Sequence, residues 1–381
     1  MRDDRIYRKL QRHLDKQPVG FPRDRSGSDI RLLKHHFSVE EAVIALAMSY
    51  RYETVDIIMD RIPGFIKMKG ALIPDVADLR KCLDSMSQKI SIMRKEENGI
   101  IYYCLVPLVI GMYEGKVFEM DAEYLEAYDS YAHAMQHGLS FISTYVPQMR
   151  TIPIEAVIPA VHDIMQYDDV REHINNTSGP IFIIECSCRK RKKIHGDPCK
   201  QTQRSETCMV FGDIAKVMLR FNQGREVRKD EALEIIRENQ LEGLVLQTYN
   251  MQHPEVICSC CSCCCEVLGI HRMLPNPRIF TSASYHAAID PGKCIGCRQC
   301  EKKCQVGALT FDKKKKKISV VDKRCIGCGN CLPACKAGAV SLLKKMDAPV
   351  PPADFEGLQE VIMRGKPLWR LGRIIRRTLT K

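Results

Sequence analysis

The sequence lacks the features that mark exported and membrane-spanning proteins. Residues 1–15 are charged throughout and do not have the order of basic, apolar and small residues that defines an export signal. The longest apolar run, residues 100–112, contains Pro107 and is far shorter than the roughly 20 residues that a membrane span needs. We therefore expect a cytoplasmic protein that is soluble or peripheral.

Signatures of nucleotide-binding and hydrolytic enzymes are also missing. No G-x-G-x-x-G follows an expected strand and no G-x4-G-K-[ST] occurs, so the common dinucleotide and triphosphate motifs are absent. Neither G-x-S-x-G nor H-E-x-x-H occurs, so nothing points to a hydrolase. Acidic residues are outnumbered, 46 against 58 Lys and Arg, and the net charge is +12. This charge favours acidic proteins, nucleic acid or anionic lipid as partners without choosing among them.

Cysteine, in contrast, is abundant: the chain has 20. Many are adjacent or one residue apart, above all in the segment CSCCSCCC at 258–265. Neighbouring thiols cannot all reach separate partners with normal disulfide geometry, and disulfides are rare in the reducing cytosol. The cysteines therefore predict a metal-binding protein.

Eight of the cysteines form an internal repeat with a period of 31 residues. Each copy reads C-x2-C-x2-C-x3-C, and the Ile-Gly pair of 295–296 recurs at 326–327. Evenly spaced thiols of this kind suit iron–sulfur clusters, whereas zinc sites prefer C-x2-C pairs with a longer spacer. The repeat comprises Cys294, Cys297, Cys300 and Cys304, followed by Cys325, Cys328, Cys331 and Cys335.

The segment from Asp290 to Leu343 resembles the bacterial two-[4Fe-4S] ferredoxin family. In such ferredoxins the fourth cysteine of each run binds the other cluster. The resemblance implies two [4Fe-4S] clusters with crossed ligands, namely Cys294, Cys297, Cys300 and Cys335 for one, and Cys325, Cys328, Cys331 and Cys304 for the other. The family usually has proline after each run, where this chain has Gln305 and Lys336.

A second group of cysteines lies in the middle of the chain. It follows two expected strands, 181–184 and 256–257, whose pairing would bring its members together. Clustered soft thiolates select iron–sulfur, zinc or copper(I). The group consists of Cys186, Cys188, Cys199, Cys208, Cys258, Cys260, Cys261, Cys263, Cys264 and Cys265.

We expect at least one further iron–sulfur centre in this region. The main alternative is a structural zinc bound by Cys186, Cys188, Cys199 and Cys208. The arrangement resembles one found upstream of ferredoxin domains in iron–sulfur proteins of anaerobic bacteria and archaea, a largely uncharacterised family, and implies electron transfer without a particular substrate. The adjacent basic residues 189–193 would lower the pKa of the thiols.

The chain is expected to be an α+β protein with several domains. Residues 1–116 favour a winged-helix-like domain, with helices after the capping-box pair Ser38 and Glu41, over 54–62 and over 75–86, and a hairpin at Asn98-Gly99. Further helices are expected over 118–142 and 153–164. The remaining parts are a mixed α/β cysteine-rich domain (117–273), a linker (274–289), the two-cluster ferredoxin-like domain (290–345) and a basic amphipathic tail (346–381).

Two basic segments suggest contacts with partners. The run 313–317 is five lysines, which would either dock an acidic redox partner or form a solvated hairpin turn. The segment 368–381 places leucines and isoleucine on one helical face and basic residues on another. It would either lie on the inner face of an anionic membrane, dock a partner, or remain a frayed tail.

These features predict an iron–sulfur electron-transfer protein that serves a partner oxidoreductase in anaerobic metabolism. The motifs favour an electron-transfer subunit or carrier over an enzyme with its own substrate pocket. The alternative is a redox-sensing regulator that binds DNA through the winged-helix-like domain. The expected recognition helix, 75–86, mixes Arg80 and Lys81 with three aspartates, which is a poor set for phosphate contact, so we expect no specific nucleic-acid binding.

Overall fold

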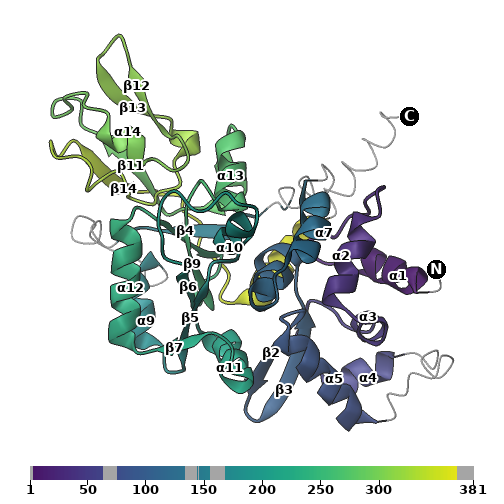
Figure 1. Ribbon diagram of the computed structural model, residues 1–381. Coiled ribbons are helices and arrows are strands. Elements are labelled where there is room, and N and C mark those ends of the chain that lie inside the picture. Colours follow the sequence, from purple (N-terminus) through teal and green to yellow (C-terminus); the bar gives the residue numbers. More distant parts are fainter. Residues whose placement is uncertain (1–2, 63–74, 134–143, 145, 155–167, 367–381) are drawn as a thin grey trace. The chain divides into compact units, whose positions relative to one another are not determined.

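The computed structural model describes residues 3–62, 75–133, 144, 146–154 and 168–366 (Figure 1). They belong to two compact units, each described separately below. The first comprises residues 1–145, 213–223 and 359–381, and the second comprises residues 146–212 and 224–358. Among the described residues, no helix has the length and apolar character needed to cross a bilayer.

The first unit is mainly helical and has one small sheet, of order β1-β3-β2, in which all pairs are antiparallel. Its elements are α1 (Asp4–Leu14), α2 (Ser28–His36), α3 (Val39–Ala45), β1 (Glu53–Thr54), α4 (Val55–Arg61), α5 (Val76–Gln88), β2 (Ile92–Glu97), β3 (Ile100–Leu105), the irregular turns η2 (Leu108–Met112) and η3 (Lys116–Phe118), α6 (Tyr113–Gly115), α7 (Ala122–Ala132) and α11 (Gly212–Phe221).

Local signals in the sequence locate several of these elements correctly. The Ser38 side chain accepts a hydrogen bond from the Glu41 backbone amide and the Glu41 side chain returns the contact, which confirms the capping box before α3. Asn98 and Gly99 both have positive φ and join β2 to β3, as the hairpin signal predicts. Strand β2 begins at Ile92, three residues later than expected. The order of three helices and a hairpin matches the expectation, while assignment to the winged-helix class stays a prediction.

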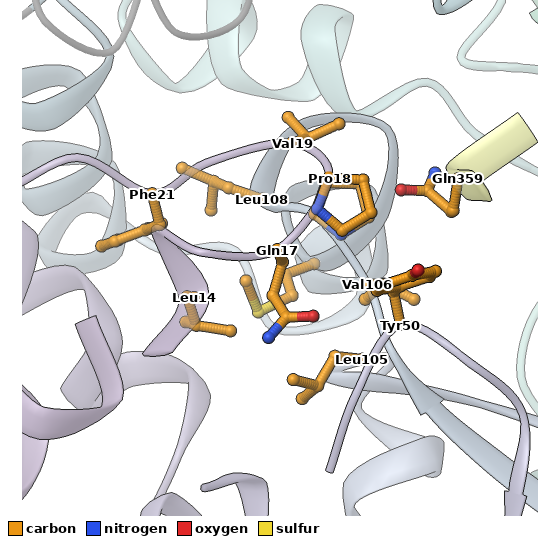
Figure 2. A pocket seen from close by; sticks show the side chains of 12 residues that line it. Leu14, Gln17, Pro18, Val19, Phe21, Tyr50, Leu105, Val106, Leu108 and Gln359 are labelled. Atoms are coloured by element: carbon orange, nitrogen blue, oxygen red, sulfur yellow. The ribbon is translucent and has the colours of Figure 1, made fainter. Parts of the chain in front are cut away.

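The first unit has a small apolar pocket (Figure 2). Pro18, Val19 and Phe21 contribute to it, together with Leu105 at the end of β3 and Leu108 of η2. Its remaining polar side chains are amides and one tyrosine, and its lining has no cysteine, histidine or carboxylate. The chemistry suggested by the cysteines therefore lies elsewhere.

The second unit is built on a seven-stranded sheet of order β10-β4-β8-β9-β6-β5-β7. Only the β10–β4 pair is parallel. The elements of this part are β4 (Met149–Ile152), α9 (Val170–Asn176), β5 (Ile181–Glu185), α10 (Ser187–Ile194), β6 (Glu206–Val210), β7 (Arg225–Val227), α12 (Lys229–Leu241), β8 (Val245–Tyr249), β9 (Val256–Cys260), α13 (Glu266–Met273), η6 (Pro277–Ile279) and β10 (Thr281–Ser282).

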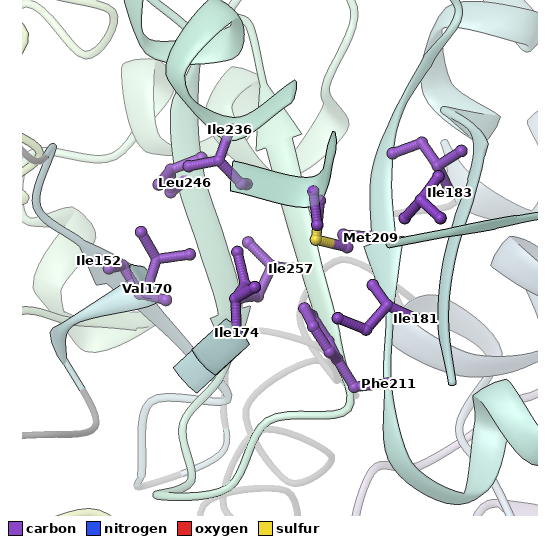
Figure 3. Close-up of a cluster of buried hydrophobic side chains, with 12 residues drawn as sticks. Ile152, Val170, Ile174, Ile181, Ile183, Met209, Phe211, Ile236, Leu246 and Ile257 are labelled. Carbon is purple, nitrogen blue, oxygen red and sulfur yellow. The ribbon is translucent and has the colours of Figure 1, made fainter. Parts of the chain in front are cut away.

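The hydrophobic core of the second unit lies between this sheet and helices α9 and α12 (Figure 3). Met209 of β6 and Ile257 of β9 are fully buried in it and stand opposite each other in the sheet. Ile174 of α9 and Ile236 of α12 cover them. Because side chains alternate along a strand, this packing turns the neighbouring residues of β6 and β9 to the other face of the sheet.

A smaller part with two two-stranded sheets completes the second unit and contains both cysteine repeats. Strands β11 and β14 form one antiparallel pair and β12 and β13 another. Lysines 313–316 form the exposed turn of the second hairpin. The elements are β11 (Tyr285–Ile289), α14 (Gln299–Lys303), β12 (Leu309–Asp312), β13 (Lys317–Val320), η7 (Asp322–Arg324) and β14 (Val340–Lys344). Residues 355–366 are also helical, and from residue 359 onward they belong to the first unit.

Several expected boundaries differ from the structure. The segment 274–289, expected as a linker, contains β10 in the large sheet and β11, which pairs with β14. Of the helix expected over 118–142, α7 accounts for residues 122–132, and residues 134–143 lie outside the described residues. Most of the helix expected over 153–164 and all of the tail segment 368–381 lie outside them as well.

Candidate metal centres

The second cysteine run lines a cavity together with the last cysteine of the first run. Cys304, Cys325, Cys328 and Cys331 all line this pocket, whose other walls are mostly apolar. Burial is the main cause that raises the pKa of Cys328 to about 12 and also raises the pKa of Cys325 and Cys331. A soft metal centre replaces these protons and gains four thiolate ligands, so the residues fit a [4Fe-4S] cluster.

In the other predicted ligand set, the last cysteine of the second run likewise lies near cysteines of the first run. Burial raises the pKa of the Cys300 thiol, and the nearby thiols of Cys335 and Cys297 add to the effect. Cys297 is exposed and Cys294 is half-buried, so this set lies closer to solvent than the set around Cys304. Cys304 is thus electrostatically coupled to the three leading thiols of the second run, and Cys335 is coupled to Cys300 of the first run.

Backbone groups prepare these sulfurs for negative charge. The amide of Ala308 donates to Cys304 Sγ at 3.1 Å, and the amide of Ala339 donates to Cys335 Sγ at 3.3 Å. These two contacts occupy equivalent positions in the repeat. A third amide, that of Ala287 in β11, donates to Cys325 Sγ at 3.3 Å. Amide donors of this kind tune the reduction potential of a cluster.

Steric crowding explains why glycine occurs in both copies of the repeated Ile-Gly pair. Gly296 and Gly327 have φ values of +71° and +66°, in the left-handed region that favours glycine. A Cβ atom at Gly296 would collide with the carbonyl oxygen of Lys316, and one at Gly327 with the carbonyl oxygen of Tyr285. The loops between the first and second cysteines of each run can therefore pack closely only without a side chain there.

The middle cysteines start from the sheet face opposite the core. Cys208 precedes Met209 and Cys258 follows Ile257, so the alternation of β6 and β9 places both thiols on the face away from α12. Cys260 shares this face at the end of β9. Strand β6 lies between β5 and β9, so the two expected strands do not pair directly, and β6 supplies Cys208 between them.

Six of these thiols form a closed ring of hydrogen-bonded neighbours, here called the six-thiol ring. Each sulfur interacts with two others, and the chain around the ring closes on itself. In order around the ring the members are Cys186, Cys188, Cys265, Cys260, Cys258 and Cys208. Six convergent soft ligands exceed the four that one cube requires.

Hydrogen bonding couples the thiols of the six-thiol ring. Hydrogen bonds from Cys208 and Cys260 lower the pKa of Cys258 to about 5, and hydrogen bonds with neighbouring thiols also lower the pKa of Cys186 and Cys265. Thiols this close together share their negative charge, which suits a metal centre bound by thiolates.

Two helices begin at the six-thiol ring. Cys186 is the N-cap of α10 and Cys265 is the N-cap of α13. The positive end of a helix dipole stabilises thiolate at such a position. Arg191 of α10 and Glu266 of α13 form an ion pair of 2.6 Å, which joins the first turn of one helix to the body of the other.

A buried arginine lies beside the ring. Arg189 is 5% exposed and donates to the hydroxyl of Thr207 and, at 2.7 Å, to the carbonyl oxygen of Ser259. Burial opposes its charge, but the sulfurs of Cys186, Cys261 and Cys208 outweigh this and raise its pKa. Arg189 is fixed by contacts to both β6 and β9, so we expect it to act on the sulfurs.

Replacement of Arg189 by glutamine should lower the reduction potential of any iron–sulfur centre at the six-thiol ring, because the cation stabilises the reduced, more negative state. We expect a shift on the order of 60 mV, the equivalent of tenfold in a one-electron equilibrium. Arg189→Lys keeps the charge and should shift less. Anaerobic potentiometric titration followed by EPR measures both variants, and equal potentials for Arg189→Gln and wild type would exclude this role.

The other four middle cysteines form a separate group, here called the four-thiol site. Cys199, Cys261, Cys263 and Cys264 offer sulfurs that all lie within 4.8 Å of one another. The zinc set that the sequence suggested, Cys186 and Cys188 with Cys199 and Cys208, is not brought together, because Cys199 lies in the four-thiol site and the other three lie in the six-thiol ring. Leu244 packs against Cys261 and Cys264.

The ferredoxin-like part is hydrogen-bonded to the cysteine turn of the large sheet. Gln305 accepts a bond of 3.0 Å from the backbone amide of Ser262 and donates one of 3.2 Å to the carbonyl oxygen of Gly243. Asn330, between Cys328 and Cys331, donates to the same carbonyl at 2.8 Å. Sequence reasoning did not identify these residues, although the departure from proline at 305 was a signal.

Comparison with known proteins supports one part of the chain. Residues 293–339 match the 4Fe-4S dicluster domain family, so a domain of ferredoxin type lies near the C-terminus. No curated protein and no solved structure matches the chain. The matched domain and the further cysteines together support iron–sulfur electron transfer.

Proposed function

We propose that the protein is a one-electron relay in which two [4Fe-4S] clusters exchange electrons with a further centre at the six-thiol ring. The observation that carries this proposal is the bond between Gln305 and Ser262. Gln305 follows Cys304 of the second cluster set directly, and Ser262 lies two residues after Cys260 of the six-thiol ring. Covalent chain and hydrogen bonds thus lead from one set of cysteines to the other.

The chain's own residues would perform three tasks in this relay. The cysteines would hold [4Fe-4S] clusters, which supply one-electron chemistry at low potential when bound. The amides of Ala287, Ala308 and Ala339 would stabilise negative charge on the ligand sulfurs. Arg189 would balance the charge of the six-thiol ring in a buried setting where an uncompensated charge is costly.

Electrons would enter or leave through a partner oxidoreductase of anaerobic metabolism, in the cytoplasm. The exposed lysine turn at 313–316 lies on the ferredoxin-like part and suits an acidic docking surface. Peripheral contact with a membrane through the segment 368–381 is a separate proposal, and that segment lies outside the described residues.

The charges of α5 make the alternative hypothesis, a redox-sensing regulator that binds DNA, less favourable than the electron relay. Lys81 forms an ion pair with Asp78 at 2.9 Å, which reduces its value for phosphate contact. Asp84, on the same helix, receives hydrogen bonds from Tyr103 and Arg220. We propose that the first unit binds protein and has no specific affinity for nucleic acid.

Gln305→Pro tests the relay. Proline restores the residue usual in dicluster ferredoxins but removes the three hydrogen bonds of the Gln305 side chain, so the clusters should remain while electron transfer to the middle centre slows severalfold. Lys336→Pro is the matched control, since Lys336 occupies the equivalent position in the second run and is exposed. Rapid-freeze EPR after mixing with a reductant measures the rate, and equal rates for Gln305→Pro and wild type would refute this path.

A further inference from the structure

We propose that the four-thiol site binds a single Zn²⁺ ion that is distinct from the iron–sulfur centres. Cys199 Sγ lies 3.6 Å from Cys261 Sγ and 3.8 Å from Cys263 Sγ. Cys263 Sγ lies 3.5 Å from Cys261 Sγ and 3.8 Å from Cys264 Sγ. This inference does not depend on the relay, because it concerns four thiols outside the six-thiol ring and outside the ferredoxin repeat.

The separations match one ion and not a cube. Zinc–sulfur bonds of about 2.3 Å in a tetrahedron place ligand sulfurs about 3.8 Å apart. The ligand sulfurs of a [4Fe-4S] cluster are roughly 6 Å apart, because each is bound to a different iron at a corner of the cube. Four of the six sulfur–sulfur separations are 3.5–3.8 Å and all six are within 4.8 Å, which leaves room for one metal ion only.

The backbone supplies a reason for this convergence. Strand β9 ends at Cys260, and a tight turn follows in which the amides of Cys264 and Cys265 donate to the carbonyl oxygen of Cys261 at 3.3 and 2.9 Å. The turn brings three thiols together within four residues. Cys199 lies in the loop after α10, so the bound ion would link that loop to the end of β9.

The chemistry of the donors favours zinc over ferrous iron. Four thiolates prefer tetrahedral geometry, and the Irving–Williams order places Zn²⁺ above Fe²⁺ in affinity. A tetrathiolate zinc carries two negative charges, and Arg189 lies 3.9 Å from Cys261 Sγ to offset part of them. Zinc has no redox chemistry, so its task here would be structural: it would hold the turn whose Ser262 amide receives Gln305.

Metal analysis of the full chain, purified without oxygen, tests this assignment. Wild type should contain about one zinc per chain, and X-ray absorption at the zinc edge should show four sulfurs at about 2.3 Å and no neighbouring iron. This measurement on wild type needs no variant to fold. Iron neighbours of zinc, or the absence of bound zinc, would overturn the proposal.

Cys263→Ser should lose most of the zinc and keep its iron and sulfide content. Cys263→His, which offers another good zinc ligand, should retain it, and Cys82→Ser is the control from outside the site. Loss of iron and sulfide with Cys263→Ser in a protein that still unfolds cooperatively would assign these thiols to an iron–sulfur centre instead. If zinc is bound but no electrons pass between the ferredoxin clusters and the six-thiol ring, the proposed function is refuted and the zinc assignment stands.

Discussion

Cys328→Ser should remove one of two [4Fe-4S] clusters and leave the other intact, whereas Cys297→Ser should remove the other. Each change takes one ligand from a different crossed set, so about four irons should be lost in each case and about four retained in the ferredoxin-like part. Cys328 lines the pocket, while Cys297 is exposed. The cluster that remains in Cys328→Ser therefore lies closer to solvent, and it should be lost more readily in oxygen than the cluster that remains in Cys297→Ser.

EPR of the reduced variants distinguishes the two clusters. The crossed assignment adds a sharper test, because Cys304→Ser should reproduce the spectrum of Cys328→Ser and not that of Cys297→Ser, although Cys304 belongs to the same run as Cys297. A Cys304→Ser spectrum that matches Cys297→Ser would show that each run binds its own cluster. Loss of both signals from any single change would indicate unfolding or one shared cluster.

Cys208→Ser should remove the centre at the six-thiol ring. Cys208 stands in the middle of the sheet between Cys186 and Cys258, so its replacement opens the ring at a buried position. We expect all iron beyond the roughly eight atoms of two ferredoxin clusters to be lost, with both ferredoxin signals retained.

Two controls make this result specific. Cys104→Ser alters a buried cysteine of β3 in the first unit, and its iron content should equal that of wild type. Zinc should stay bound in Cys208→Ser, since the four-thiol site keeps all of its ligands. Unchanged iron in Cys208→Ser would mean that Cys208 does not bind iron.

Local signals explain which parts of the fold could be predicted. The capping box at Ser38 and Glu41 and the Asn98-Gly99 turn depend on neighbouring residues only, and the structure has both. The segment 274–289 has the composition of a linker, yet Tyr285–Ile289 pairs with Val340–Lys344. A strand that depends on a partner more than fifty residues away leaves little trace in its own sequence.

The spacing of the cysteines along the chain predicts one of the two cysteine-rich parts better than the other. The regular repeat predicted a two-cluster domain, and residues 293–339 match the 4Fe-4S dicluster domain family, while the assignment of each ligand stays a prediction. The ten middle cysteines were correctly expected to gather, but their division into six and four was not foreseen. Within 258–265, Cys258 and Cys260 lie on a strand face and Cys261, Cys263 and Cys264 lie in the following turn, so the division depends on where β9 ends.

The most direct test of the relay is a reductive titration of the full chain without oxygen, with iron, sulfide and EPR signals counted at each step. The account predicts more than about eight irons per chain, two [4Fe-4S] signals, and a third signal that is absent from Cys208→Ser. An iron content of about eight with only the two ferredoxin signals would contradict it, and would leave the ferredoxin-like part as the only redox module.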